Sequence, residues 1–329
     1  MTILVTGAAG FIGAYLCQAL YHRGQAVVGI DQYTPYYDPE LKHDRVAHLC
    51  PKVMIHRCDI TNYAELSQIA AEIAPTHVVH LAAQAGVRYS LENPSLYGQT
   101  NLMGFLNVLE ICRHLPIPHL IFASSSSVYG DSATPPFTET QPIQQPRSLY
   151  AATKIANEAM AYSYSHLYGI YTTGLRFFTV YGPWGRPDMA PVTFSRAILA
   201  GQPIDVFDHG QQQRDFTHID DILQGILGAL ATSGHTPQRH RLFNLGNQTP
   251  VDLETLIAVI ERAAGRRADK RYQQARAGDM QATLADTSLA QAAFGFATNV
   301  TIEVGMPAVV AWCKAYFSPA QSGKHCQPA

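Results

Sequence analysis

The sequence predicts an α/β fold, in which a doubly wound parallel sheet is followed by a second, smaller α/β lobe. In the first half of the chain, short and nearly continuous apolar runs alternate with stretches of helical periodicity. This is the pattern of parallel strands that are buried on both faces and joined by crossover helices. A glycine-rich turn joins the first strand to the first helix. After about residue 180 the chain changes to short elements with Gly-, Pro- and Gln-rich connections, which indicates a separate lobe.

The composition agrees with a globular protein of one large or two moderate domains. Of the 329 residues, 47% are hydrophobic and 15% are charged, so a sizeable core can be buried. The formal net charge of −2 gives no reason to expect nucleic acid or an anionic membrane as a partner. The six cysteines form no CxxC pair, and the histidines show no metal-site spacing. Because no membrane span or signal peptide is visible either, we expect a cytoplasmic protein without a bound metal.

The expected elements follow in chain order. Strands are expected at residues 2–6, 26–30, 52–58, 77–81 and 119–125, and helices at residues 11–23, 62–74, 95–114 and 149–168. In the second half, "LFNLGN" (242–247) predicts a strand and "VDLETLIAVIERAAG" (251–265) a capped amphipathic helix. We expect a first domain of residues 1–180 with 217–248, a smaller lobe of residues 181–216 with 249–317, and a loose tail at 318–329.

The segment "VTGAAGFIG" predicts a nucleotide-binding turn, because its glycines at 7, 10 and 13 lie between a strand and a helix. The glycines permit a tight turn and let a pyrophosphate approach the helix N-terminus. Asp31 ends the second strand, and a carboxylate there can accept hydrogen bonds from both ribose hydroxyls and repel a 2′-phosphate. This favours NAD over NADP. The alternative is that Asp31 only caps a loop.

Two further segments follow the ends of strands. Asp59, in "CDIT", can reach an adenine or can cap the next helix, with Thr61 or alone, and the sequence does not decide between these roles. The segment "HLAAQAGV" (80–87) contains mostly small residues. They allow a ligand to approach the backbone, or they allow close packing of a helix.

Tyr150 and Lys154, in "YAATK", are four residues apart in a helical pattern and therefore share one helix face. An ammonium beside a phenol favours the phenolate and lowers the phenol pKa from ~10. The pair can thus supply a base near neutral pH. The alternative is an ordinary exposed pair. The position of this pair after a strand that ends in serines favours the catalytic interpretation.

Four serines follow the fifth apolar run, in "SSSSVYG" (124–130). While the backbone stays extended, Ser125 and Ser127 point to one side, and Ser124 and Ser126 to the other. The carboxyl end of a central parallel strand is where such folds bind ligands. We therefore interpret the run as the lip of an active site, whose hydroxyls can bond a substrate without adding charge.

Together these motifs resemble an extended short-chain dehydrogenase/reductase with a Rossmann-type domain, specifically a nucleotide-sugar epimerase. The resemblance extends to about residue 317 and includes "RFFTVYGP" (176–183) and "RDFTHIDD" (214–221). The longer strings "AGVRYSLENP", "GPWGRPDMA" and "GQQQRDFTHIDDI" are most similar to UDP-glucuronate 4-epimerases.

The resemblance implies a role for individual residues. Tyr150 is implied as the catalytic base, Lys154 as its electrostatic and ribose-binding partner, Ser125 as the catalytic hydroxyl and Ser127 as a hydroxyl near the sugar carboxylate. The residues implied to bind NAD are Gly7, Gly10, Phe11, Ile12, Gly13, Asp31, Asp59, Ile60, Leu81, Ala82, Ala83, Ser124, Tyr150 and Lys154. Those implied to bind the UDP-sugar are Arg88, Ser125, Ser127, Tyr150, Thr179, Arg186, Arg214, Arg276 and Asp279. Without the resemblance, Thr179 would be interpreted as a satisfied strand hydroxyl, and Arg186, Arg214 and Arg276 as members of surface ion pairs.

The implied reaction is NAD-dependent C4 epimerisation of UDP-glucuronate to UDP-galacturonate. In it, hydride passes to bound NAD, the 4-keto sugar rotates, and hydride returns to the other face. A UDP-glucose/galactose 4-epimerase and a UDP-glucuronate decarboxylase begin with the same oxidation. Decarboxylases and 4,6-dehydratases usually have an acid two residues before the tyrosine of VYG, where this chain has Ser127. A non-catalytic NAD-sensing protein is expected to lack the tyrosine or the lysine, and both are present. The resemblance also implies a homodimer that forms through two helices per subunit, including the helix with Tyr150.

Overall fold

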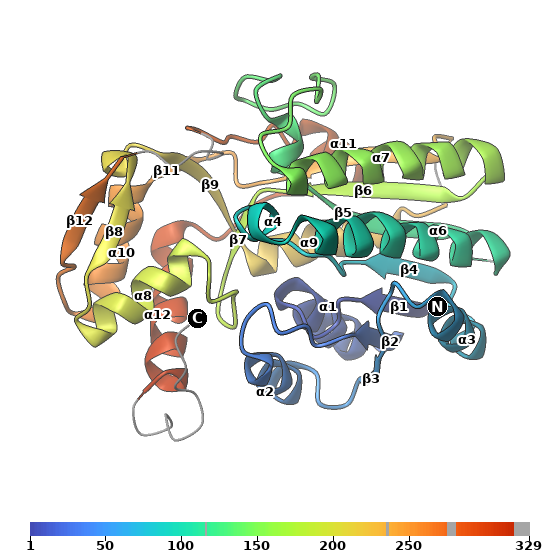
Figure 1. Ribbon diagram of the computed structural model, residues 1–329, viewed down its shortest axis with the longest axis horizontal. Coiled ribbons are helices and arrows are strands. Elements are labelled where there is room, and N and C mark those ends of the chain that lie inside the picture. Colours follow the sequence, from blue (N-terminus) through green and yellow to red (C-terminus); the bar gives the residue numbers. More distant parts are fainter. Residues whose placement is uncertain (116, 235–236, 275–280, 319–329) are drawn as a thin grey trace. The chain divides into compact units, whose positions relative to one another are not determined.

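The structure, a computed structural model, describes residues 1–115, 117–234, 237–274 and 281–318 (Figure 1). Its contacts divide the chain into two compact units. The first unit comprises Met1–Phe177, Leu223–Leu245 and Asp286–Ala297, and the second comprises Phe178–Ile222, Gly246–Ala285 and the described residues from Thr298 onward.

Four segments belong to a different unit from the one we expected. Residues 178–180, 217–222 and 246–248, expected in the first domain, belong to the second unit. Residues 286–297, expected in the smaller lobe, belong to the first unit. The reason is that helix α11 (Ser288–Phe294) packs against strand β10 (His240–Leu245), where the Phe243 and Phe294 rings meet edge to face with centroids 5.0 Å apart. The expected tail lies outside the described residues from position 319 onward.

The first unit contains a seven-stranded sheet. Its strands are β1 (Thr2–Thr6), β2 (Ala26–Asp31), β3 (Met54–Arg57), β4 (His77–His80), β5 (His119–Ser125), β6 (Tyr171–Phe177) and β10. They lie in the order β10-β6-β5-β4-β1-β2-β3, and every pairing is parallel. The chain reverses its direction across the sheet between β1 and β4, and doubly wound sheets bind nucleotides at the carboxyl ends of the strands beside such a point. The predicted doubly wound α/β fold is therefore confirmed.

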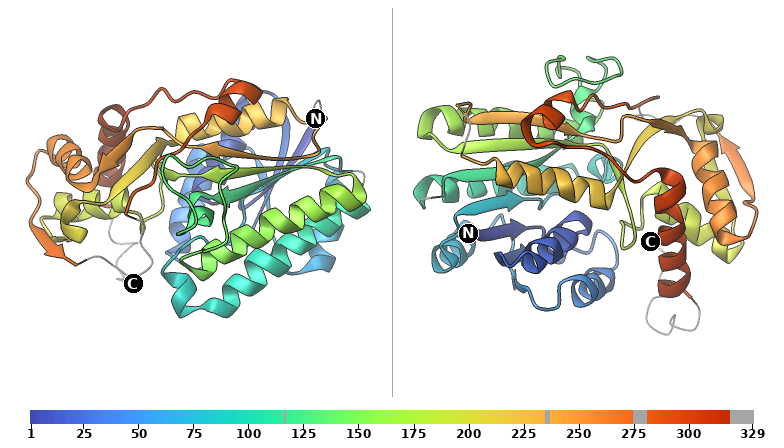
Figure 2. Two further views of the ribbon diagram at one scale, coloured as in Figure 1. Left: turned by 90° about the horizontal axis from the view of Figure 1, so that it is seen from above. Right: turned by 180° about the vertical axis from the view of Figure 1, so that it is seen from behind.

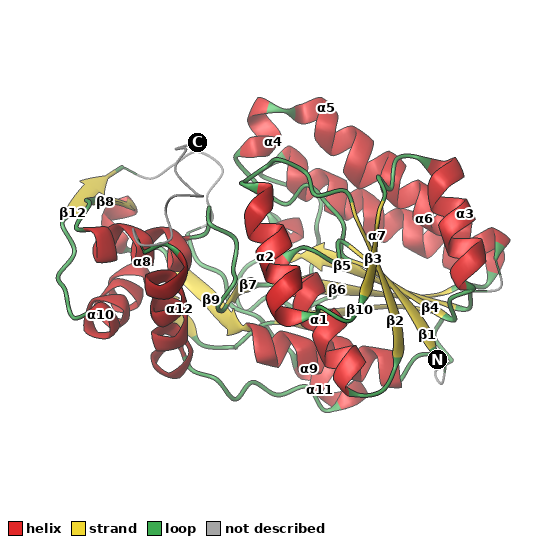
Figure 3. Ribbon diagram, turned by 90° about the horizontal axis from the view of Figure 1, so that it is seen from below, coloured by secondary structure: helices red, strands yellow, loops and turns green. Residues whose placement is uncertain are grey.

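Helices cover both faces of this sheet. They are α1 (Phe11–His22), α2 (Pro39–Leu49), α3 (Tyr63–Ile73), α4 (Tyr89–Glu92), α5 (Pro94–Tyr97), the π-helix η1 (Gly98–Gly104), α6 (Phe105–His114), the 3₁₀-helix η2 (Ser126–Tyr129), α7 (Leu149–Tyr168), α9 (Ile219–Ala231) and α11. Helices α3, α6 and α7 lie on one face, and α1 and α9 lie on the other (Figures 2 and 3). The core on the α3–α6–α7 side includes Leu4, Phe105 and Phe122.

The sequence predicted part of this unit and missed strand β6 and helices α2, α4, α9 and α11. The bounds of β1, β5 and α7 are those expected, whereas the expected helix 95–114 is divided into α5, η1 and α6. Helix α2 was not predicted. Two of its four buried residues are Lys42 and Arg45, so its buried face does not show as an apolar stripe.

The second unit combines small sheets with three helices. Strands β7 (Thr179–Tyr181), β9 (Gln213–His218) and β11 (Pro250–Asp252) form one sheet, and β8 (Ile204–Phe207) pairs with β12 (Lys270–Gln273), next to the 3₁₀-helix η3 (Asp208–Gly210). Helices α8 (Ala190–Ala200), α10 (Leu253–Ala264) and α12 (Ile302–Tyr316) pack against one another. The predicted caps of α10 are present, because Asp252 accepts from the Thr255 backbone N–H at 2.7 Å and Gly265 ends the helix at φ +65°.

Asp215 on β9 organises the second unit. Its carboxylate is fully buried and accepts hydrogen bonds from the backbone N–H groups of Asn247, Gln248 and Ala285. These bonds join β9 to two loops that are distant in the sequence.

None of the helices in the described part of the chain is both long enough and apolar enough to cross a membrane. Nor do the described residues contain a group of three or more His, Cys, Asp or Glu side chains that could hold a metal ion.

Candidate active site

The glycine-rich turn between β1 and α1 is closely packed. Gly7 has φ +72°, and a Cβ atom on it would lie 2.7 Å from the backbone nitrogen of Ala82. A Cβ atom on Gly13 would lie 2.1 Å from the Gly7 carbonyl oxygen. Helix α1 begins after Gly10 without a side-chain cap, so the backbone N–H groups of its first turn remain available to an anion. The turn therefore fits the pyrophosphate of a dinucleotide.

Asp31, at the end of β2, is held in place by this turn. Its two carboxylate oxygens accept hydrogen bonds from the backbone N–H groups of Ala9, at 3.0 Å, and Tyr33, at 2.7 Å. Each carboxylate oxygen can accept more than one hydrogen bond, so the loop contacts leave capacity for ribose hydroxyls. The structural and the cofactor-binding interpretations of Asp31 are thus compatible.

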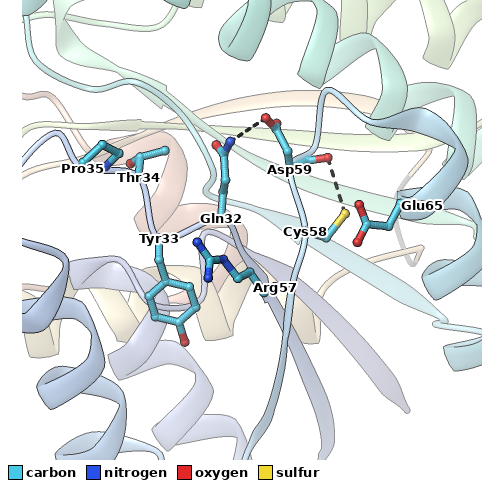
Figure 4. A pocket seen from close by; sticks show the side chains of 8 residues that line it. All are labelled: Gln32, Tyr33, Thr34, Pro35, Arg57, Cys58, Asp59 and Glu65. Atoms are coloured by element: carbon cyan, nitrogen blue, oxygen red, sulfur yellow. Dashed lines mark hydrogen bonds between the residues drawn. The ribbon is translucent and has the colours of Figure 1, made fainter.

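Asp59 follows β3 and borders a cavity of about 430 Å³ (Figure 4). Its carboxylate accepts from the Gln32 side-chain amide at 2.7 Å and from the Thr61 backbone N–H at 2.9 Å. It does not cap helix α3, because Asn62 is the N-cap residue there. The cavity is lined by Gln32, Tyr33, Thr34, Pro35, Arg57, Cys58, Asp59 and Glu65.

The remaining residues expected to bind NAD are distributed around the same sheet edge. Leu81 and Ala82 follow β4 and donate backbone hydrogen bonds to the backbone and side-chain oxygens of Thr6, at 3.1 and 3.3 Å. Phe11 and Ile12 belong to the first turn of α1, Ala83 continues the segment after β4, and Ile60 is buried after β3.

Tyr150 and Lys154 lie in the first two turns of α7. The Lys154 ammonium donates to the Ala123 carbonyl oxygen of β5 at 2.8 Å, and its side chain is buried. Burial lowers the pKa of Lys154 to about 8, although the nearby Glu158 carboxylate opposes this fall. The Tyr150 ring meets the ring of buried Tyr97 edge to face with centroids 6.4 Å apart, and the Tyr97 hydroxyl bonds to the Gly86 carbonyl.

A buried hydrogen-bond network of side-chain amides, which the sequence did not predict, holds the helical turn that carries Tyr150. The Asn101 side chain in η1 exchanges hydrogen bonds with the backbone of Gln84, at 2.9 and 3.0 Å, and donates to the Thr153 hydroxyl at 3.1 Å. The Thr153 hydroxyl donates to the Tyr150 carbonyl, and Asn157 donates to the Asn101 carbonyl, both at 2.7 Å. The sequence signal that could have indicated this network is the presence of Asn101, Thr153 and Asn157 within helices that pack on the sheet.

The structure corrects the expected geometry of the serine run. Strand β5 ends at Ser125, and Ser126–Tyr129 form the 3₁₀-helix η2, so the strand alternation does not extend to Ser127. The Ser125 hydroxyl accepts from the Ser127 backbone N–H at 3.2 Å. The Ser124 hydroxyl points to the other side of the strand and donates to Glu158 at 2.6 Å. Any cofactor contact at Ser124 must therefore come mainly from its backbone.

The residues expected to bind the substrate are found in both units. Exposed Arg88 immediately precedes α4 in the first unit, and half-buried Thr179 begins β7 in the second. In the second unit Arg186 forms a two-point ion pair with Asp188, at 3.1 and 2.5 Å, which is the alternative that its residue type suggested. Arg214 donates to the Gln212 side chain at 3.1 Å. Arg276 and Asp279 lie outside the described residues.

Known proteins resemble this chain along nearly its full length. The model of the NAD dependent epimerase/dehydratase family matches residues 3–246. UDP-glucuronate 4-epimerase 4 of Arabidopsis thaliana is 46% identical over 333 residues, which cover 97% of this chain and 76% of the relative.

Solved structures agree in fold. A UDP-glucuronic acid 4-epimerase from Bacillus cereus, in complex with UDP-glucuronic acid and NAD, matches with 34% identity and a TM-score of 0.88, covering 96% of this chain and 99% of that chain. A UDP-glucose 4-epimerase from Thermus thermophilus, in complex with NAD, matches with 29% identity and a TM-score of 0.85, covering 96% and 100%.

The position of Asp31 leads to a test of cofactor choice. We expect Asp31→Asn to weaken NAD binding about tenfold or more, because an amide of the same size cannot accept the same set of hydrogen bonds. The variant should also discriminate less against NADP, since the charge that repels a 2′-phosphate is removed. The dissociation constants of both dinucleotides for cofactor-stripped protein measure this. Glu40→Gln, at an exposed carboxylate of α2, is the control, and equal NADP and NAD affinity in the unmodified protein would contradict the assignment.

Proposed function

This chain belongs to the NAD dependent epimerase/dehydratase family, and from that premise we propose that it catalyses the NAD-dependent C4 epimerisation of UDP-glucuronate to UDP-galacturonate. The observation that carries the proposal is the set of Tyr150, Lys154 and Ser125 at one edge of the sheet, where α7 is bonded to β5. The choice of sugar is supported by the 46% identity to UDP-glucuronate 4-epimerase 4 of Arabidopsis thaliana.

The first unit supplies the residues that would hold NAD. The backbone of the glycine-rich turn would bind the pyrophosphate, and Asp31 would accept from the adenosine ribose. The cavity beside Asp59 is large enough for the adenine, and its mixture of polar and apolar side chains suits a heteroaromatic ring. When bound, NAD supplies both the acceptor and the donor of hydride at C4.

The chain's own residues would control protons and orientation. Tyr150 would take the proton of the C4 hydroxyl and later return it, and the Lys154 ammonium would stabilise its phenolate. Ser125 would hydrogen-bond the C4 oxygen. Thr179, Arg186, Arg214, Arg276 and Asp279 are proposed to bind the UDP-sugar, and Ser127 its carboxylate. Arg88 is proposed as a further substrate contact.

The pKa of Lys154 gives this mechanism a pH limit. With the pKa at about 8, most Lys154 side chains carry a proton at pH 7. As the pH rises through this value the ammonium is lost, and the phenolate loses its stabilising charge. We therefore expect turnover to fall at alkaline pH.

Two other reactions share the first oxidation step. UDP-glucose 4-epimerisation is favoured by the structural match to the Thermus thermophilus enzyme. Decarboxylation of UDP-glucuronate is disfavoured because Ser127 stands where the resemblance places an acid in decarboxylases.

A cytoplasmic location remains part of the proposal, since the six cysteines form no CxxC pair.

The assignment of the base is tested by Tyr150→Phe. The variant should retain its fold and its NAD, but turnover of UDP-glucuronate should fall by about 10²–10⁴-fold because only the proton-transfer group is removed. Chromatographic separation of the products measures the rate. Tyr21→Phe is a control, since it removes the hydroxyl of an exposed tyrosine on α1. Turnover within a few-fold of the unmodified enzyme would show that another group is the base.

We use the name serine turn for the 3₁₀-helix η2, which directly follows Ser125. Its role is tested by Ser127→Ala, with Ser126→Ala in the same turn as control. A neutral hydroxyl can hold the sugar carboxylate through a charge-assisted hydrogen bond of ~1.5–3 kcal/mol. Its loss should lower the preference for UDP-glucuronate over UDP-glucose by about ten- to a hundred-fold in relative kcat/KM. In the 4-keto intermediate the carboxylate is β to a ketone, so a loosely held carboxylate should also release some UDP-pentose. An unchanged preference, with no pentose, would assign Ser127 a structural role.

We further propose that two copies of the chain associate through η1, α6 and α7. These helices lie side by side (Figure 2). They present Met103, Tyr162 and Leu167, which are 55%, 61% and 63% exposed. Light scattering should give the mass of two chains, and Met103→Lys should increase the monomer fraction. Met54→Lys, at an exposed methionine of the edge strand β3, should not do so. A monomeric unmodified protein would contradict this proposal.

A further inference from the structure

A buried ion pair lies one helical turn beyond Lys154. Glu158 of α7 and Arg176 of β6 are only 4% and 1% exposed. The Arg176 Nε and Nη2 atoms donate to the two carboxylate oxygens of Glu158 at 2.9 and 2.8 Å, so the contact is a two-point one. It fixes the centre of α7 against the sheet.

The same pair also holds the serine turn. The Ser124 hydroxyl of β5 donates to Glu158 at 2.6 Å, and Ser124 is paired in register with Arg176 across the sheet. Arg176 Nη1 donates to the Tyr129 hydroxyl of η2 at 3.0 Å, and Tyr129 donates to Asn244 of β10 at 2.7 Å. One carboxylate thus connects α7, which carries Tyr150 and Lys154, to the strand end that carries Ser125.

We propose that Glu158 is a positioning residue for the epimerisation. It holds α7 at a fixed position relative to the end of β5, and it places a negative charge beside the Lys154 ammonium. This inference rests on the proposed function.

The groups that surround Lys154 support the electrostatic part of the proposal. His80 of β4 is fully buried, and its pKa is lowered to about 3 by burial and by Lys154, so it adds no positive charge at neutral pH. Tyr150 lies in the first turn of α7 with the Tyr97 ring packed against it, and Arg176 and Tyr129 lie beyond Glu158. Of these groups Glu158 is the carboxylate that favours the ammonium form of Lys154.

Stability alone gives a weak reason for such a pair. Replacing a buried ion pair by neutral groups is often without cost in stability, whereas removing one partner leaves an uncompensated charge. A variant that removes both charges can therefore separate the electrostatic role of Glu158 from its role in folding.

The test compares Glu158→Gln, Glu158→Asp and the double variant Glu158→Gln/Arg176→Met. Glu110→Gln is the matched control, because Glu110 of α6 also bonds α7, through the Tyr164 hydroxyl at 2.5 Å, but far along the helix from Lys154. The chain has only six lysines. NMR of protein labelled with ¹³C-lysine can therefore follow the titration of Lys154 directly, with Lys154→Met used to assign its signal.

We expect Glu158→Gln and the double variant to lower the titration midpoint of Lys154 by about one pH unit. The alkaline limb of kcat for UDP-glucuronate should move by the same amount, with kcat at pH 8 reduced about fivefold and KM changed by less than about threefold. Glu158→Asp and Glu110→Gln should leave the midpoint in place.

If the double variant folds, retains NAD and keeps both the Lys154 midpoint and the alkaline limb of the unmodified enzyme, the proposal is overturned. The NMR titration does not depend on turnover. An inactive unmodified enzyme whose Lys154 midpoint still shifts in the variants would therefore refute the proposed function and retain the electrostatic role of Glu158.

Discussion

Burying the Lys154 ammonium is the constraint on which the arrangement of the first unit depends. A charged group removed from water requires polar partners, and this one receives the Ala123 carbonyl and the field of Glu158. Glu158 is buried in turn and requires Arg176, which bonds Tyr129 as well. Each partner is on a different element, so satisfying one cation aligns a helix, two strands and the serine turn.

This chain of dependence explains why the polar residues of α7 are found mainly on its inner face. Thr153, Lys154, Asn157 and Glu158 are all buried and all hydrogen-bonded to other elements. Most helices of α/β proteins pack on their sheet through apolar stripes. In α7 part of that packing is replaced by directed bonds, which fix rotation about the helix axis more narrowly than aliphatic contacts do.

The sequence predicted the parts of this fold whose signals are local. Strand β5 and helix α7 are long and regular, and a carboxylate at Asp31 has a recognisable place after a strand. The sequence did not predict helix α2, where Lys42 and Arg45 are buried. The order of polar and apolar residues in this helix resembles that of an exposed segment. The predicted orientation of Ser127 was wrong because a 3₁₀ turn follows the strand. No local signal in a run of four serines indicates where the extended backbone ends. The partners of Asn101 could not be inferred either, since Thr153 and Asn157 come near it only through tertiary packing.

The π-helix η1 has a consequence for how this chain can vary in length. A π-helical turn contains one residue more than the α-helical turn that it replaces, so it behaves as a single insertion accommodated within a helix. Asn101 lies inside it and uses both its side chain and its carbonyl to contact α7 and the segment after β4. Deleting one residue between positions 98 and 104 could restore regular helix geometry, yet it would rotate every preceding side chain by about 100° relative to α6. The segment is therefore expected to be intolerant of any change in its number of residues.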